Sequence, residues 1–243
     1  MNWFLNFLFP IYPLRCSLCG EPLLQHPWMD MGICSSCAGA LRKESIKDVE
    51  ICSTCGMPLI SERDSCLTCR TKQHYYSSHR SLFMYQGKAR SLLKAYKFQS
   101  VSSLSLLWAQ LLFEVIQFEL NQQEFSQPPI IVPVPSRGRS VRARGWDQME
   151  LVRRYLSRRY CLSTAKILSR TGGSSQKKLN YSQRMLNLSG HITCTCTAAE
   201  LPQKIILIDD VYTTGATIDE CSRVLQQVGT TEINALTLAI TPY

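Results

Sequence analysis

The stretch ILIDDVYTTGAT, residues 206–217, runs from a short apolar segment into two adjacent aspartates and then into a turn of small and hydroxyl-bearing residues. A short apolar run rich in β-branched residues is typical of a parallel strand that is buried on both faces. Ligands of such sheets bind beyond the carboxyl ends of the strands, and Asp209 and Asp210 fall at that edge. We therefore expect the two carboxylates to belong to a binding site.

The turn after the aspartates has the composition of an anion cradle. Its hydroxyls can donate hydrogen bonds, its glycine lets a ligand approach the backbone, and the start of the next helix supplies free N–H groups. Carboxylates do not hold a phosphate themselves, but they can hold hydroxyls or a metal ion attached to a phosphorylated molecule. The candidate residues of the turn are Thr213, Thr214, Gly215, Ala216 and Thr217.

Strands and helices alternate in the C-terminal two thirds of the chain. Like the run that precedes the aspartates, residues 130–134 (IIVPV) and 233–240 (INALTLAI) are short apolar segments that predict strands. Residues 144–160 and 216–229 carry apolar side chains at helical spacing. This alternation predicts an α/β fold with a mainly parallel sheet.

The N-terminal part of the chain contains eight cysteines in four CxxC pairs. Two such pairs can complete the tetrahedral shell of a zinc ion. Pairs followed by glycine alternate with pairs that lack it, which favours two sequential sites over a cross-braced arrangement. The expected ligands are Cys16, Cys19, Cys34 and Cys37 for one ion and Cys52, Cys55, Cys66 and Cys69 for the other. The sequence thus predicts a double zinc ribbon domain with two structural zinc ions in residues 1–75, followed by the α/β domain in residues 80–243.

The net charge of +9 is concentrated in one part of the chain. Residues 137–184 hold thirteen lysines and arginines against two acidic residues. Such a segment favours a polyanionic partner, either nucleic acid or a phosphorylated small molecule. A solvated basic face has the same composition, so charge alone does not choose between these interpretations.

The apolar N-terminus, MNWFLNFLFPIYP, is broken by Pro10 and Pro13 and is too short to span a bilayer. It also lacks the basic start and the small-residue cleavage site of a secretory signal. We therefore expect no transmembrane segment and a cytoplasmic location.

The order of an apolar strand, D-D-x-x-x-T-G-x-T and a helix resembles the fingerprint of type I phosphoribosyltransferases, which bind phosphoribosyl pyrophosphate (PRPP). The longer order, from the four CxxC pairs through VPVPSRGRSVRARGWDQ and SRTGGSSQKKLNYSQRMLN to that turn, resembles the ComF family of competence proteins, also called ComFC. That family usually has R-G-F-N-Q where this chain has R-G-W-D-Q, residues 144–148. The substitution places the negative charge of Asp147 near a supposed anion site and leaves its role open.

The resemblance implies a mode of PRPP binding. The 5′-phosphate would lie on the 213–217 turn, and Asp209 and Asp210 would hold the ribose hydroxyls. Pyrophosphate and a magnesium ion would lie against the loop after the VPVP strand, where Ser136, Arg137 and Arg139 are the binding candidates.

The resemblance also implies a lid over the site. The segment RTGGSSQKKLNYSQRMLN, residues 170–187, is polar and rich in glycine and serine. Its closure would exclude water from the transition state in which pyrophosphate leaves. Arg170 and Arg184 are the catalytic candidates in this segment, and Gln176, Lys177 and Lys178 are further candidates for the lid.

Three functions stay open at this point. By resemblance, the chain is a ComF-like protein that binds PRPP and handles single-stranded DNA during DNA uptake in natural transformation, with a DNA-translocating helicase as a candidate partner. The alternative is an active phosphoribosyltransferase, a pentosyltransferase that uses PRPP and magnesium on a base or amine acceptor. A regulatory PRPP sensor is a third interpretation. The residues identify no acceptor site, so the sequence does not decide whether the chain is an enzyme.

Overall fold

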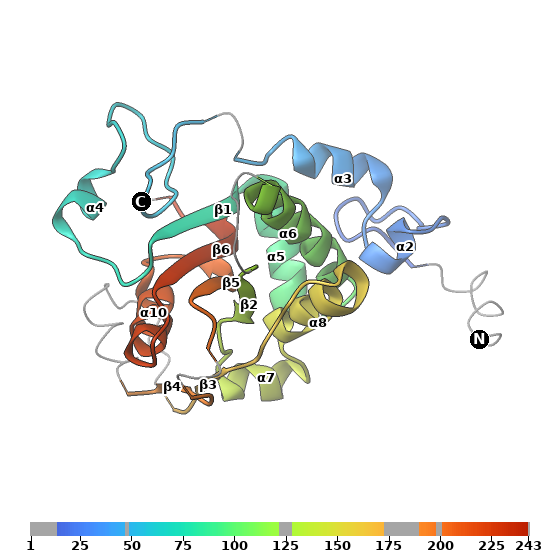
Figure 1. Ribbon diagram of the computed structural model, residues 1–243. Helices are drawn as coiled ribbons and strands as arrows, with labels where there is room; N and C mark the ends of the chain where they lie inside the picture. Colours follow the sequence, from blue (N-terminus) through green and yellow to red (C-terminus); the bar gives the residue numbers. More distant parts are fainter. Residues whose placement is uncertain (1–13, 47–48, 122–127, 173–189, 198–200, 243) are drawn as a thin grey trace.

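The computed structural model describes residues 14–46, 49–121, 128–172, 190–197 and 201–242 (Figure 1). In chain order the elements are α2 (Trp28–Met31), α3 (Ser35–Arg42), α4 (Leu67–Thr71), β1 (Ser78–Met84), α5 (Gly87–Phe98), α6 (Leu104–Asn121), β2 (Ile130–Pro133), α7 (Gly138–Arg144), α8 (Gln148–Tyr160), β3 (Leu168–Arg170), β4 (Ile192–Cys194), β5 (Lys204–Tyr212), α10 (Ala216–Gln227) and β6 (Glu232–Ile240).

Four strands form one parallel sheet in the order β1-β6-β5-β2. In the central pair, Ile206 of β5 lies opposite Asn234 of β6 and Asp209 lies opposite Thr237. Strands β3 and β4 form a separate antiparallel pair. The expected α/β fold with a mainly parallel sheet is confirmed, and β2, β5 and β6 are the strands that the apolar runs predict.

Helices cover both faces of this sheet, as its apolar strands require. Ile206 and Ile208 of β5 pack into a core with α5, α6 and α8. Ile205 and Leu207 point to the other face and pack into a second core with α10. This alternation follows from the two-residue period of a strand. In Figure 1, α5, α6 and α8 lie on one side of the sheet and α10 on the other.

The most apolar helix, α6, belongs to the first of these cores. Its side chains Leu107, Trp108 and Leu112 are buried there against the sheet and its neighbouring helices. In the part of the chain that the structure describes, no helix is both long and apolar enough to cross a membrane.

The cysteine-rich N-terminal part packs against both faces of the α/β body. The first unit, residues 14–46 with α2 and α3, joins the core that contains α6. The second unit, residues 49–77 with α4, joins the core that contains α10. Figure 1 shows the two units on opposite sides of the molecule. Each core therefore includes one N-terminal unit, and the division between residues 1–75 and 80–243 stays a prediction.

Candidate functional site

Strand β5 carries two carboxylates to the carboxyl edge of the sheet. The backbone N–H of Asp210 donates a 2.8 Å hydrogen bond to Asp209 Oδ1. Desolvation, and then the neighbouring Asp210 carboxylate, raise the pKa of Asp209 to about 7. Burial thus favours the protonated form of Asp209, and a cation that enters the site would favour the ionised form.

Lys97 of α5 lies against the second carboxylate, with its Nζ 2.8 Å from Asp210 Oδ2. Burial lowers the pKa of Lys97, but the attraction of Asp210 and then of Asp209 outweighs burial, and the net shift is upward. Sequence reasoning missed this lysine. A signal was present, because Lys97 continues the four-residue spacing of the buried residues Ala89 and Leu93. A lysine in line with an apolar stripe needs an acidic partner.

The turn between β5 and α10 is built around Gly215. The glycine has a φ of 76°, and a Cβ at this position would lie 2.4 Å from Tyr212 Oη. Helix α10 begins directly after it, so the first N–H groups of the helix have no intrahelical acceptors. The buried Thr214 Oγ1 has no hydrogen-bond partner among the described residues. These donors together have the chemistry of an anion site.

The loop after β2 lies beside this edge because β2 is the neighbour of β5 in the sheet. Ser136 Oγ donates a 3.0 Å hydrogen bond to Asp147 Oδ1. The same carboxylate accepts from the Glu150 N–H at 3.3 Å and caps the N-terminus of α8. Asp147, whose charge was unexplained by the sequence, therefore has a local structural role.

Arg170 contributes positive charge near Asp209, and Arg137 lies near Arg170. Burial lowers the pKa of Arg170, the nearby Arg137 lowers it further, and Asp209 acts in the opposite direction. Arg170 Nε is buried and has no hydrogen-bond partner within the described ranges. Two cations held close together are an arrangement that a bound anion would stabilise.

The structure thus places most of the predicted residues at one sheet edge. They are Asp209, Asp210, Thr213, Thr214, Gly215, Ala216, Thr217, Ser136, Arg137 and Arg170. Arg184, the other catalytic candidate, lies outside the described residues, as do Gln176, Lys177 and Lys178. The roles of all these residues toward PRPP stay predictions.

The eight N-terminal cysteines form two clusters in sequence order, Cys16 to Cys37 and Cys52 to Cys69. In each cluster the four sulfur atoms lie within 4.8 Å of one another. Sulfur–sulfur distances across the two CxxC pairs are 3.8 Å in the first cluster and 3.6 Å in the second. A tetrahedral zinc ion with Zn–S bonds of about 2.3 Å requires about 3.8 Å. These two clusters, the first and second cysteine sites, therefore fit two structural zinc ions.

Backbone N–H groups favour the thiolate form of one cysteine in each site. The N–H of Cys34 points to Cys16 Sγ, and that of Cys66 to Cys52 Sγ, both at 3.4 Å. Burial alone would raise the pKa of Cys16 and Cys52, but backbone donors lower the pKa to about 7 in both. Since zinc binds thiolates, this backbone arrangement suits metal binding.

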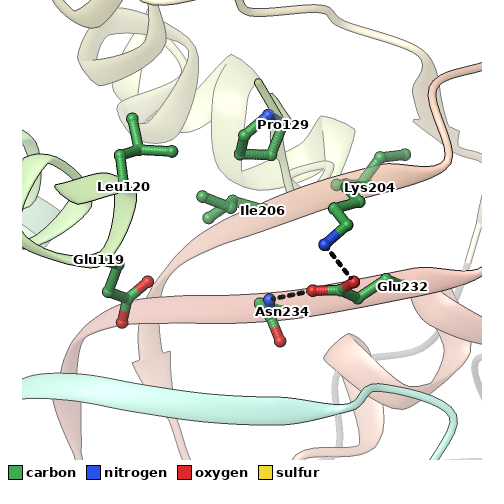
Figure 2. A pocket seen from close by; sticks show the side chains of 8 residues that line it. Glu119, Leu120, Pro129, Lys204, Ile206, Glu232 and Asn234 are labelled. Carbon is green, nitrogen blue, oxygen red and sulfur yellow. Dashed lines mark hydrogen bonds and ion pairs between the residues drawn. The ribbon is translucent and has the colours of Figure 1, made fainter. Parts of the chain in front are cut away.

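A small hollow at the amino edge of the sheet is lined by Lys204 of β5 and Glu232 of β6 (Figure 2). These two side chains pair at 2.7 Å, and Asn234 Nδ2 donates to Glu232 Oε1 at 3.4 Å. The cavity volume of about 20 Å³ is room for a single water molecule. Because the polar groups bind one another, we assign no ligand to this hollow.

Comparisons with known proteins match the N-terminal part to a domain family and most of the chain to individual proteins. The double zinc ribbon domain family matches residues 4–70. Competence protein F of Haemophilus influenzae is 29% identical over 151 residues, which cover 61% of this chain and 66% of that protein. Competence protein ComFC of Streptococcus pneumoniae is 30% identical over 176 residues, covering 71% and 74%. DNA utilization protein YhgH of Escherichia coli K12 is 28% identical over 234 residues, covering 94% and 98%.

Among solved structures, a hypoxanthine phosphoribosyltransferase from Staphylococcus aureus is similar with a TM-score of 0.32 and 13% identity, covering 59% of this chain and 65% of that one. The fold assignment rests on the sheet topology described above and not on this likeness.

The fold and the site define a class of protein in which a double zinc ribbon precedes a mainly parallel α/β domain. At the carboxyl edge of its sheet this domain carries an acidic pair, Asp209 and Asp210, and a turn with the chemistry of an anion site, residues 213–217, called the anion turn below. Within this class, the chain belongs to the ComF (ComFC) family of competence proteins.

Proposed function

We propose that this chain acts in DNA uptake as a ComF-like protein that binds PRPP through an α/β domain of the type I phosphoribosyltransferase kind and handles single-stranded DNA. The names of its relatives, competence proteins and a DNA utilization protein, support the role in DNA uptake. The observation that carries the PRPP site is the gathering of two carboxylates, two arginines and a turn with an unpaired hydroxyl at one sheet edge.

The acidic pair is assigned to the ribose. Its hydroxyls would donate to Asp209 and Asp210, while the 5′-phosphate accepts from the first N–H groups of α10 and from Thr214 Oγ1. Lys97 holds the Asp210 carboxylate in place before a ligand enters, because its ammonium group lies 2.8 Å from Asp210 Oδ2. The second carboxylate is therefore already an acceptor in the unliganded protein.

The arginines are assigned to the pyrophosphate. Arg137 and Arg170 supply positive charge, and Ser136 supplies a hydroxyl on the neighbouring loop. Clustered phosphate oxygens need more neutralisation than two side chains give, so we include magnesium, with water and substrate as most of its ligands. Arg184 keeps its proposed place in the lid.

Exposed basic side chains on α7 and α8 are the proposed surface for single-stranded DNA. Arg153 of this segment is bound to Glu150 and Thr164, and the exposed Arg154 also pairs with Glu150, at 3.0 Å. The exposed arginines are Arg139, Arg142, Arg154, Arg158 and Arg159. Binding through phosphates would weaken with salt, with a slope of about −0.7 per phosphate neutralised on a single strand.

Calorimetric titration of the full chain with PRPP and magnesium tests the site. Asp210→Ala is expected to weaken PRPP binding about 10- to 100-fold, because a charged hydrogen-bond acceptor is lost. Glu232→Ala is the matched control, since Glu232 is also a lysine-paired carboxylate, at 2.7 Å, but lies at the opposite edge of the sheet (Figure 2). The assignment fails if wild-type protein does not bind PRPP or if both variants bind it equally well.

An active phosphoribosyltransferase is the second candidate function. The observation that favours it is Arg170, whose buried Nε lacks a partner in the described ranges and is therefore available to the leaving pyrophosphate. Consumption of PRPP with release of pyrophosphate, when bases or amines are added to the titrated protein, would establish this activity. Binding of PRPP without turnover, together with salt-sensitive binding of an oligonucleotide, would favour the DNA-uptake function alone.

A further inference from the structure

The linking segment, residues 72–77, connects the second cysteine site to β1 and contacts the start of α10. His74 Nε2 lies 3.7 Å from the sulfur of the zinc ligand Cys69, and His74 Nδ1 lies 2.8 Å from Asp219 Oδ2. The Tyr75 N–H donates to the other oxygen of Asp219 at 3.1 Å. Asp219 is completely buried in the first turn of α10. The His74 ring therefore contacts both a zinc ligand and the helix that follows the anion turn.

Lys72 of the same segment reaches the turn itself. Its Nζ lies 3.6 Å from Asp219 Oδ2 and 3.5 Å from the backbone oxygen of Thr214. Four thiolates around one zinc ion carry net negative charge, and Asp219 adds to it, so the ammonium group balances the charge of both. The lysine fixes the backbone that bears the unpaired Thr214 hydroxyl.

Tyr212, which precedes the anion turn, also contacts residues that follow the second cysteine site in the chain. Its Oη lies 2.8 Å from Tyr76 Oη, and its ring stacks on His79 with 4.1 Å between ring centroids. His79 Nδ1 donates a 2.7 Å hydrogen bond to the backbone oxygen of the zinc ligand Cys55. The Tyr212 hydroxyl fills the space that a side chain at Gly215 would occupy. The second cysteine site thus also supports the tyrosine that shapes the turn.

The first N-terminal unit, which carries the first cysteine site, has a different neighbour. It packs on α6, where Arg42 Nη2 lies 2.6 Å from Glu114 Oε1, and its apolar side chains belong to the core on the opposite face from α10. The two sites therefore offer an internal comparison, because they share one metal chemistry and differ in what they touch.

We propose that the second cysteine site is the positioning element of the anion turn. With zinc bound, it holds Tyr212, Thr214 and Asp219 in place through residues 72–79, so that zinc at this site sets the affinity of the turn for phosphate. The effect on affinity rests on the proposed function, whereas the effect on the order of the turn does not. His74, Lys72 and Tyr76 are positioning residues in this arrangement.

Hydrogen exchange of the zinc-loaded full chain tests the proposal. In His74→Gln, backbone amides of residues 212–219 are expected to exchange about tenfold faster than in wild type, and PRPP affinity to fall by a similar factor. The matched control is His26→Gln, because His26 also pairs with an aspartate, Asp30, at 3.1 Å but belongs to the first unit. The control is expected to change neither quantity, and both variants to retain two zinc ions per chain.

Tyr76→Phe keeps the test decisive if His74→Gln loses zinc or fails to fold. This variant removes only the hydroxyl that contacts Tyr212 and leaves the zinc ligands intact. Faster exchange of the turn in Tyr76→Phe supports the proposal, and exchange equal to wild type overturns it. Faster exchange in a protein whose wild type does not bind PRPP would support positioning by the second site and reject the proposed function.

Discussion

The two cysteine sites share four ligands, the CxxC spacing and a similar sulfur geometry, yet they occupy different environments. In the first site Cys19 is exposed and only Cys16 is buried, whereas in the second site Cys52, Cys55 and Cys66 are all buried. The first unit covers the α6 face of the body, and the second lies against α10 and the anion turn. One metal motif thus occurs in two settings, in a more exposed unit against α6 and in a more buried unit against the turn, and our proposal gives only the second a part in binding.

The largest expected difference concerns loss of a ligand. Cys66→Ser should lower the free energy of unfolding by about 4–5 kcal/mol or more, because the second zinc ion holds residues that belong to the core with α10. Cys19→Ser should cost about 1–3 kcal/mol, since Cys19 is exposed. Thermal unfolding with zinc analysis of both variants measures the difference, and equal losses would break the comparison.

The order of zinc release is the next expected effect. A chelator should remove the first zinc ion about tenfold faster than the second, because the first site is more exposed. Native mass spectrometry should show a species with one zinc ion, and hydrogen exchange of the turn should stay slow until the second ion leaves. Simultaneous release, or release of the second ion first, would contradict the difference in burial.

The smallest effect is expected at the contact of the first unit with α6. Arg42→Ala removes an ion pair with Glu114 in which both side chains are about 40% exposed. Such a surface pair contributes about 0.5–1 kcal/mol, and the loss should be smaller at high salt. Thermal melts at two salt concentrations measure it. A loss of unfolding free energy as large as that of Cys66→Ser would contradict the weaker contribution expected of this contact.

The sequence predicts the apolar strands of the sheet better than the strand with a polar interior face. Strands β2, β5 and β6 are apolar runs, and the regular CxxC spacing identifies both metal sites. Strand β1 escaped detection because it places polar side chains in the interior. His79 is buried and bonds both the Cys55 carbonyl and Thr237 Oγ1, and Ser81 Oγ lies 2.6 Å from the same threonine. Partners distant in the chain satisfy these groups, and no local pattern reveals them.

The candidate site also contains residues that could be predicted from the sequence and residues that could not. The acidic pair and the turn are contiguous in the sequence, so their place at the carboxyl edge could be predicted. The partnership of Lys97 with Asp210 could not, because it depends on how α5 packs beside β5. The N-cap role of Asp147 was also not predicted, because the apolar spacing places the helix over residues 144–160 and does not mark its start at Gln148.

Strand β6 follows the other three strands of its sheet in the sequence, yet it is an inner strand, between β1 and β5. As the chain leaves the ribosome, both sets of cysteines emerge early and can take up zinc before the sheet exists. Strand β6, the partner of β1, is synthesised after the other three strands. The sheet is therefore complete only when residues 232–240 insert between β1 and β5. A chain that stops before Glu232 would keep every zinc ligand and lack the strand that joins the metal-bearing half to the aspartates.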